Sequence, residues 1–402
     1  WMVAAMAATS PYLTFFASET RMYTLVVLLS LVTVTAYVHV FVFGRGRYLP
    51  VFVVALAALL YTHNWGLLFY VAAGAGLVPC LLATTDRRLM LRRAAIGFGA
   101  VAALYALWVP TLLAQIRHTG APWSWRPTVR EMVSVLADVL GDPHERVLVA
   151  LVLTAGVALY AMVIGPRTRR KTAVQALAIV AALTLVMGWA SSQLRPAWSF
   201  RYLAVILPAL LLLAAAGLAA SGRRGVVALV LIVVFWTQPV GRLTGARVAA
   251  RRDAKAADHE LALAVRPVLH NGDLIISTQM EEVPVLRYYL GARLDYANPA
   301  GVVADPLVAD WTDATERLRA ATTANLAPAV EHLPAGAHVF LVCNASPEKP
   351  ELEWFQIMTK RCDDWKSHMG SSPLFRRVPV SALRELEEEG GRFLGVFEKV
   401  GP

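Results

Sequence analysis

Charged side chains are scarce in this sequence. Asp, Glu, Lys and Arg make up only 16% of its 402 residues, whereas 57% of the residues are hydrophobic. An ordinary soluble domain carries about 25% charged residues. The composition therefore excludes a typical soluble globular protein and predicts a polytopic α-helical membrane protein.

Acidic residues are scarcest in the first part of the chain. Residues 1–240 hold 6 acidic and 19 basic residues, and residues 241–402 hold 22 acidic and 19 basic ones. The net charge of +10 therefore comes from the apolar part. The positive-inside rule explains this better than nucleic-acid binding, so we expect membrane lipid and no nucleic acid as a partner.

Cysteine is also rare, with three residues in the chain. There is no C-x-x-C pair and no His/Cys cluster with zinc spacing, so we expect no metal and no cofactor. Cys80 lies in an apolar run and is interpreted as a small apolar residue. Cys343 and Cys362 lie in the polar second part. They are interpreted either as a disulfide in an oxidising compartment or as two separate buried thiols.

We expect no signal peptide in this sequence, because Trp1 already lies inside an apolar segment with no charged residues before it. Since natural chains begin with Met, we expect this chain to be the C-terminal part of a longer protein, truncated at its N-terminus.

Long apolar runs fill the first part. A membrane span needs about 20 apolar residues. Eight to nine candidate spans are expected: the tail of one at 1–9, and runs near 22–43, 48–62, 66–84, 94–114, 146–164, 172–190, 202–220 and 226–240.

Basic residues gather at alternate connections between these runs. The linkers 44–47, 84–93, 165–171 and 221–225 hold 12 of the 19 basic residues and one acid, Asp86. This pattern predicts that all four linkers face the cytoplasm and that the other connections face outward. We therefore expect a multi-pass cell-membrane protein with an extracytoplasmic C-terminal part.

The outward connection 115–145 contains an amphipathic segment. Thr128 and Glu131 form a capping-box pattern, and apolar residues then recur at helical spacing from Val129 to Leu140. This helix is expected to lie on the outer membrane surface or to pack on the outer loops of the protein.

Residues 241–402 have the pattern of a small α/β domain. Short apolar runs at 273–278, 338–343 and 392–400 predict buried strands, and helical patterns at 281–291 and 311–333 lie between them. This alternation favours at least partly parallel strands. The expected domains are a transmembrane helical domain, 1–240, and an extracytoplasmic α/β domain, 241–402.

Polar side chains in the outward connections are the candidate site. Charged groups at membrane depth are costly and usually need partners. Guanidinium groups beside a helix start are suited to a lipid phosphate. The candidates are Glu19, Arg21, Tyr23, His63, Asn64, Arg195, Arg201 and Tyr202. Alternatively, His63 and Asn64 only satisfy backbone groups in a turn, and Arg195 contacts lipid headgroups.

Four segments resemble those of a known superfamily. SPYLTFFASETRMYTLVVLLSL (10–31), YTHNWGLLFY (61–70) and RYLAVILPALLLLAAAGL (201–218) resemble segments of bacterial GT-C glycosyltransferases, relatives of the protein O-mannosyltransferases and the lipid A aminoarabinose transferase. GDLIISTQMEEVPVLRYYLG (272–291) resembles the outer-domain segment of such proteins. The similarity covers most of the chain.

This resemblance implies an enzyme of the bacterial cell envelope. It would transfer a sugar, with inversion, from a polyprenyl-phosphate donor to a protein, glycolipid or wall glycan on the outer face of the membrane. The family's catalytic carboxylate follows its first membrane helix, so the general base is expected upstream of residue 1. Arg201 and Arg195 would contact the donor phosphate, and Glu19, Arg21, Tyr23 and His63 would shape the cavity.

Two other functions stay open. A transporter or flippase for lipid-linked sugars would also place cations beside a lipid phosphate, but internal repeats are expected of it, and none is evident. A non-catalytic membrane scaffold with an outer binding domain would need no site at all.

Overall fold

The chain forms two compact units in a computed structural model. One unit comprises Trp1–Leu113 and Ser124–Val248, and the other comprises Ala114–Trp123 and Ala249–Pro402. The structure describes residues 1–17, 19, 21–140, 152–166, 168–237, 258–343, 350–390 and 392–401. The predicted run 146–164 lies partly outside the described residues, as do the end of the run 226–240 and the predicted domain boundary at 240.

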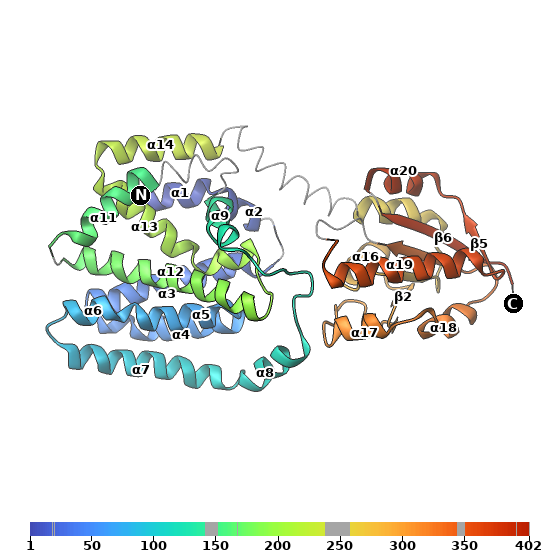
Figure 1. The fold of residues 1–402 in the computed structure, drawn as a ribbon, viewed down its shortest axis with the longest axis horizontal. Coiled ribbons are helices and arrows are strands. Elements are labelled where there is room, and N and C mark those ends of the chain that lie inside the picture. Colours follow the sequence, from blue (N-terminus) through green and yellow to red (C-terminus); the bar gives the residue numbers. More distant parts are fainter. Residues whose placement is uncertain are drawn as a thin grey trace. The chain divides into compact units, whose positions relative to one another are not determined.

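The first unit is helical (Figure 1). Its helices are α1 (Met2–Thr9), α2 (Pro11–Ala17), α3 (Tyr23–Tyr37), α4 (Leu49–Thr62), α5 (Trp65–Ala75), α6 (Leu77–Ala83), α7 (Arg87–Ala106), α8 (Val109–His118, which runs into the second unit), α9 (Val129–Leu140), α11 (Val157–Ile164), α12 (Arg169–Leu194), α13 (Leu207–Ala220) and α14 (Arg223–Thr237). A π-helical turn, Val38–Val42, extends α3. Another π-helical turn, Val152–Gly156, precedes α11, and a 3-10 turn, Gly46–Tyr48, precedes α4.

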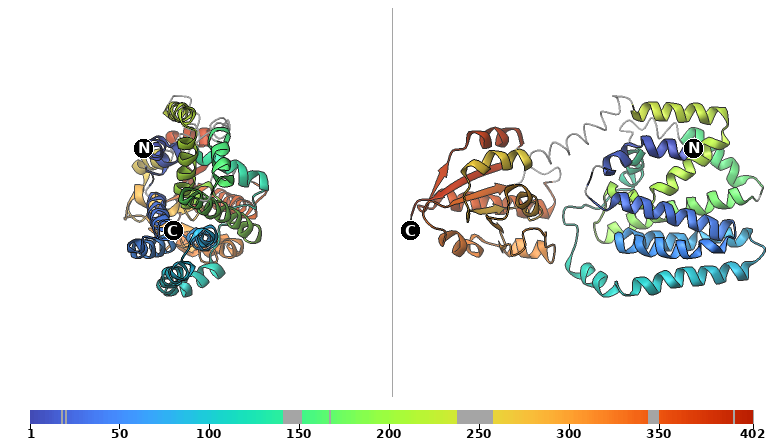
Figure 2. Two further views of the ribbon diagram at one scale, coloured as in Figure 1. Left: turned by 90° about the vertical axis from the view of Figure 1, so that its left-hand side faces the viewer. Right: turned by 180° about the vertical axis from the view of Figure 1, so that it is seen from behind.

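The helices of this unit pack side by side: α4 packs between α3 and α7, and α12 packs against α5 and α13. α7 forms an outer edge of the unit from both sides (Figure 2).

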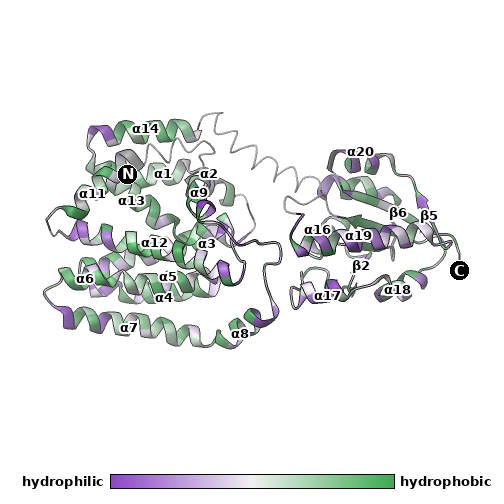
Figure 3. Ribbon diagram, viewed as in Figure 1, coloured by the Kyte–Doolittle hydropathy of each residue, from purple (hydrophilic) through white to green (hydrophobic). Residues whose placement is uncertain are grey.

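Four helical segments are long and apolar enough to cross a membrane: Tyr23–Val42, Trp65–Ala83, Arg87–Ala106 and Arg169–Leu194. They match the predicted runs 22–43, 66–84, 94–114 and 172–190. Gly46–Thr62 and Leu207–Ala220 are shorter apolar helices. The long helices are mostly hydrophobic, with hydrophilic residues at the start of α7 and at both ends of α12 (Figure 3). The length of these four segments is consistent with a membrane protein.

The linker 84–93 is largely helical, which corrects the predicted start of a span at residue 94. The Asp86 side chain accepts a hydrogen bond from the Leu89 backbone N–H at 2.9 Å and so caps α7. Arg87, Arg88, Arg92 and Arg93 therefore lie on the first two turns of the helix. Long arginine side chains at such a position can extend towards a membrane surface while the helix continues into apolar surroundings.

The capping box of α9 is confirmed. The Thr128 backbone N–H donates to Glu131 Oε2 at 2.7 Å, and the Glu131 N–H donates to Thr128 Oγ at 3.1 Å. Val135 and Val139 are buried, whereas Val129 and Val133 are more than half exposed. α9 thus packs on its own unit through one face and leaves part of the predicted apolar stripe uncovered.

The second unit is built on a mixed sheet. Its strands are β1 (Leu274–Ser277), β2 (Asp295–Asn298), β3 (Gly301–Val302), β4 (His338–Cys343), β5 (Phe375–Val378) and β6 (Phe393–Lys399), in the order β3-β2-β1-β4-β6-β5. β1 is parallel to β2 and β4, and β6 is antiparallel to β4 and β5. The predictions of strands at 273–278, 338–343 and 392–400 and of partly parallel pairing are confirmed.

Helices cover both faces of this sheet (Figure 1). They are a helix over 258–265, α16 (Val283–Leu290), α17 (Ala314–Ala320), α18 (Ala327–Glu331), α19 (Glu353–Ser371) and α20 (Ser381–Gly390), with 3-10 turns at Arg266–Val268 and Thr323–Asn325. Because side chains alternate along a strand, Ile276 packs with Trp365 of α19, and Ile275 packs with Leu286 of α16 on the other face.

Residues 114–123 belong to the second unit, which corrects the prediction that residues 1–240 form one domain. The backbone N–H of Asp313 donates to the His118 carbonyl at 2.7 Å, and His118 Nδ1 lies 3.1 Å from Asp313 Oδ1. The rings of Trp123 and Trp311 are 4.6 Å apart. These contacts join segments nearly 200 residues apart, so the pattern of apolar runs contains no sign of them.

A disulfide joins Cys343, at the end of β4, to Cys362 in α19, with the Cα atoms 5.6 Å apart. It fastens this helix to a central strand. The third cysteine, Cys80, is free and buried.

The disulfide predicts a specific labelling result. Alkylation of the unfolded chain should modify one cysteine without reductant and all three after reduction. Replacing Cys343 and Cys362 with Ser should lower the free energy of unfolding by about 3 kcal/mol, because a closed loop restricts the unfolded chain. Cys80→Ser is the matched control and should leave the reductant-dependent step intact. Three labelled thiols before reduction would contradict the bridge.

Candidate functional site

The candidate residues come from three connections of the helical unit, α2–α3, α4–α5 and α12–α13. α2 ends at Ala17 and α3 begins at Tyr23, so residues 15–23 do not form one helix. Glu19 instead lies in a turn, where its backbone N–H donates to the Phe16 carbonyl at 3.3 Å. Tyr23 is the first residue of α3 and is buried.

His63 lies in the turn between α4 and α5 and is 8% exposed. Its Nδ1 accepts a hydrogen bond from the Trp65 backbone N–H at 3.1 Å, which satisfies a free donor at the start of α5. Burial lowers the pKa of His63 to about 4, and the Arg201 charge acts in the same direction. The imidazole is consequently neutral at pH 7.

Arg201 and Tyr202 lie in a 3-10 helix, Phe200–Val205, that precedes α13. The α-helix itself begins only at Leu207, which corrects the predicted helix start at residue 202. The Tyr12 hydroxyl donates to the Arg201 carbonyl at 2.9 Å and to the Phe200 carbonyl at 3.3 Å. Tyr12 thereby holds the backbone that carries the guanidinium.

Aromatic rings connect these three segments. The ring centroid of His63 lies 5.9 Å from that of Tyr23 and 5.0 Å from that of Tyr202. The Arg201 guanidinium carbon lies 5.4 Å from the Tyr202 ring, within cation–π range. Trp65 packs on Tyr202 at 5.5 Å. Among the described residues, Arg201 Nε is buried and has no hydrogen-bond partner.

The structure therefore gathers most of the predicted residues and leaves some outside. Tyr23 interacts electrostatically with Arg201, Tyr202, Arg21 and Glu19. Arg21 itself is exposed. We call Glu19, Tyr23, His63, Arg201 and Tyr202 the outer cluster.

Asn64 and Arg195 are exposed, unlike Tyr23 and His63, and we do not count them in the outer cluster. The Asn64 carbonyl accepts a hydrogen bond from the Leu67 N–H. The Arg195 N–H donates to the Ser191 carbonyl at the end of α12. Tyr12 and Trp65 support the cluster, but sequence reasoning did not single them out. Tyr12 lies in the motif SPYLTFF and Trp65 in the motif YTHNWG, so their positions in these motifs could have indicated them.

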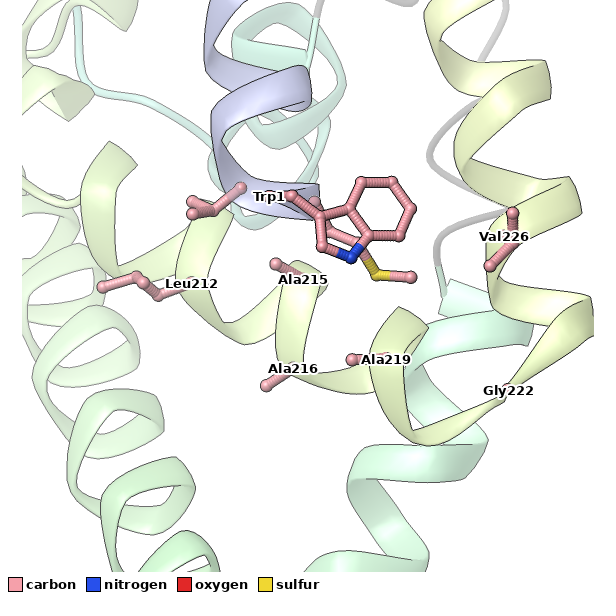
Figure 4. Close-up of a pocket in the computed structure, with 9 residues that line it drawn as sticks. Trp1, Leu212, Ala215, Ala216, Ala219, Gly222 and Val226 are labelled. Carbon is pink, nitrogen blue, oxygen red and sulfur yellow. The ribbon is translucent and has the colours of Figure 1, made fainter.

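An apolar groove of about 490 Å³ lies elsewhere in the helical unit (Figure 4). Its lining residues are Trp1, Met2, Val3, Leu212, Ala215, Ala216, Ala219, Gly222 and Val226. These side chains are apolar, so the groove is suited to an apolar group and offers no side chain for acid–base chemistry.

The α/β unit holds a partly buried ionic cluster at the carboxyl end of β1. Arg392 Nη1 lies 3.2 Å from Glu282 Oε1 and 2.7 Å from Asp258 Oδ1, and Ser277 Oγ donates to Glu282 Oε2 at 2.8 Å. Burial raises the pKa of Glu282 to about 7, although Arg392 opposes the shift. The glutamate therefore titrates near neutral pH.

This cluster predicts a pH-dependent stability. The folded unit holds the Glu282 proton more tightly than the unfolded chain does, so the free energy of unfolding should fall as pH rises from 5 to 8, by about 3 kcal/mol. Glu282→Gln should flatten this dependence, whereas Glu385→Gln, at an exposed position, should preserve it. Hydrogen exchange of the β1 amides, corrected for intrinsic rates, measures both. A stability that rises over this range would contradict the prediction.

No protein-family model, curated protein or solved structure matches the chain.

Proposed function

We propose that the chain is part of a membrane glycosyltransferase resembling the GT-C superfamily. It would move a sugar from a polyprenyl-phosphate donor to an acceptor on the outer face of the cytoplasmic membrane. The observation that carries this proposal is the buried Arg201 Nε without a hydrogen-bond partner among the described residues, beside His63 and Tyr202. A buried cationic donor that lacks an acceptor is suited to an anionic ligand.

The proposed sidedness rests on charge and on the disulfide. Basic residues at alternate connections favour a cytoplasmic position for those connections. The outer cluster then lies at the opposite side, as does the α/β unit, in which Cys343 and Cys362 are joined. Disulfides persist in oxidising, extracytoplasmic surroundings.

The proposed reaction is direct displacement at the anomeric carbon of the sugar. The acceptor hydroxyl loses its proton to a carboxylate and attacks that carbon, and the bond to the lipid phosphate breaks with inversion. Arg201 would stabilise the negative charge that grows on the departing phosphate. The neutral His63 ring would help to shape the proposed donor-binding cavity without adding charge to it. The resemblance places the general base in an outer loop that precedes these residues, so Glu19 is not assigned that role.

A transfer assay tests this function. The complete protein is reconstituted in vesicles and supplied with radiolabelled polyprenyl-phosphate sugars and a membrane extract as the acceptor source. We expect label to move from the lipid to an acceptor. Label that moves to the other leaflet but stays on the lipid would indicate a flippase instead. Label that neither reaches an acceptor nor changes leaflet would favour a scaffold.

A further inference from the structure

Three metal-ligating side chains converge at the amino end of the parallel strands. His270, Asp273 and His338 each offer one ligand atom, and these atoms lie within 4.8 Å of one another. His338 Nδ1 is 3.3 Å from Asp273 Oδ2, and His270 Nδ1 is 3.9 Å from the same oxygen. The two imidazole rings are stacked, with centroids 5.4 Å apart and planes inclined by 25°.

The sheet itself brings these residues together. Asp273 immediately precedes β1 and His338 begins β4, and the two strands pair in parallel from Leu274 and Val339. His270 lies three residues before Asp273, in a tight turn closed by a hydrogen bond from the Asp273 N–H to the His270 carbonyl. Gly272 adopts φ +86° in this turn, a conformation that glycine accommodates without strain.

Backbone donors fix the carboxylate. The His338 N–H donates to Asp273 Oδ1 at 2.8 Å, and the His270 N–H donates to Oδ2 at 2.6 Å. Asp273 is 2% exposed, so its two oxygens are held in place. Hydrogen bonds of this kind orient the carboxylate ligands of metal sites. Backbone capping accounts for the aspartate, and a hydrogen bond accounts for the position of the His338 imidazole, but neither explains a second imidazole nitrogen, that of His270, 3.9 Å from the same oxygen.

We propose that His270, Asp273 and His338 bind a divalent transition-metal ion, with zinc as the best match. Imidazole and carboxylate are established zinc ligands, and Zn–N bonds of about 2.0 Å place two tetrahedral ligand atoms about 3.3 Å apart. The distance from His338 Nδ1 to Asp273 Oδ2 already has this value, whereas the exposed His270 Nδ1, at 3.9 Å from the same oxygen, would have to move closer on binding. Water fills the fourth position, as in sites with three protein ligands.

A neighbouring glutamate is not part of the ligand set. Glu398 pairs with His338 across β4 and β6, but its Oε2 lies 2.7 Å from Arg376 Nη2. The bound ion would fasten the turn at 270–273 to the start of β4. This role concerns the α/β unit alone and does not depend on the proposed sugar transfer.

Metal binding by the complete chain tests the proposal. The protein is purified without a polyhistidine tag, treated with a chelator and titrated with Zn²⁺ against a chromophoric competitor. We expect one tight ion per chain, and Co²⁺ should give the visible absorption of a tetrahedral site. His270→Ala and His338→Ala should each weaken binding by about 100-fold or more. His332→Ala is the matched control at an exposed histidine and should change nothing.

The His270 variant separates ligation from folding. This side chain is 72% exposed, so its loss should leave the sheet intact, as far-UV circular dichroism would verify. Absence of tight zinc binding in the parent chain would overturn the proposal. Binding of unchanged affinity in the His270→Ala/His338→Ala double variant would overturn it equally.

Discussion

Arg201→Ala is expected to reduce sugar transfer from a polyprenyl-phosphate donor by about 100-fold or more. A hydrogen bond from a charged donor contributes about 1.5–3 kcal/mol, so the loss of two such bonds to a phosphate corresponds to at least this factor. Because the charge on the phosphate grows as the sugar departs, the loss should appear mainly in kcat. Transfer rates at a series of donor concentrations, with the complete protein in vesicles, measure the effect.

Arg92→Ala is the matched control for this variant. Arg92 is an exposed arginine on the first turns of α7, which the proposed sidedness assigns to the cytoplasmic side. Its removal should leave transfer unchanged. Arg201→Lys should recover part of the activity, because it keeps the charge and loses the planar fork. Equal losses from Arg201→Ala and Arg92→Ala would remove the reason to place the phosphate at Arg201.

Local patterns predicted much of the secondary structure. The strand at 338–343 and the capping box at Thr128 and Glu131 are encoded within a few residues, and the structure has both. The long apolar runs likewise correspond to helices. Hydropathy, however, reports only burial in an apolar environment. It did not predict the helix Pro11–Ala17 within the connection that precedes residue 22, or the 3-10 turn that carries Arg201. Tertiary contacts such as that of Tyr12 with the Arg201 carbonyl stabilise this irregular backbone.

The composition of the outer cluster was partly predictable for the same reason. Charged residues beside the ends of apolar runs indicated Glu19 and Arg201. The contacts of His63 with Tyr23 and Tyr202, however, depend on how three turns that are distant in the sequence pack together. The pair of His270 and His338 was missed entirely. Their separation of 68 positions matches no short motif, and only the parallel pairing of β1 with β4 brings them together.

The second large effect is expected at Gly188, where α12 meets α5. A Cβ atom at this position would lie 2.4 Å from Cη2 of Trp65. Trp65 cannot easily yield, because it is 6% exposed and packs on Trp198 at 5.6 Å and on Tyr202 at 5.5 Å. Gly188→Ala should therefore cost about 1–3 kcal/mol of stability through overpacking. It should also displace the Tyr202 ring on which the Arg201 guanidinium rests.

Gly74→Ala provides the matched comparison, since Gly74 lies on α5 and a Cβ there would meet nothing within 4 Å. Both substitutions gain about 1 kcal/mol of intrinsic helix propensity, so the difference between them isolates the collision with Trp65. Thermal unfolding in detergent, followed by tryptophan fluorescence, should place Gly188→Ala below the parent chain and Gly74→Ala at or above it. The same order is expected for transfer activity, because only the first variant disturbs the support of Arg201. If the two variants melted together, the tight contact between α12 and Trp65 would not govern the geometry of the outer cluster.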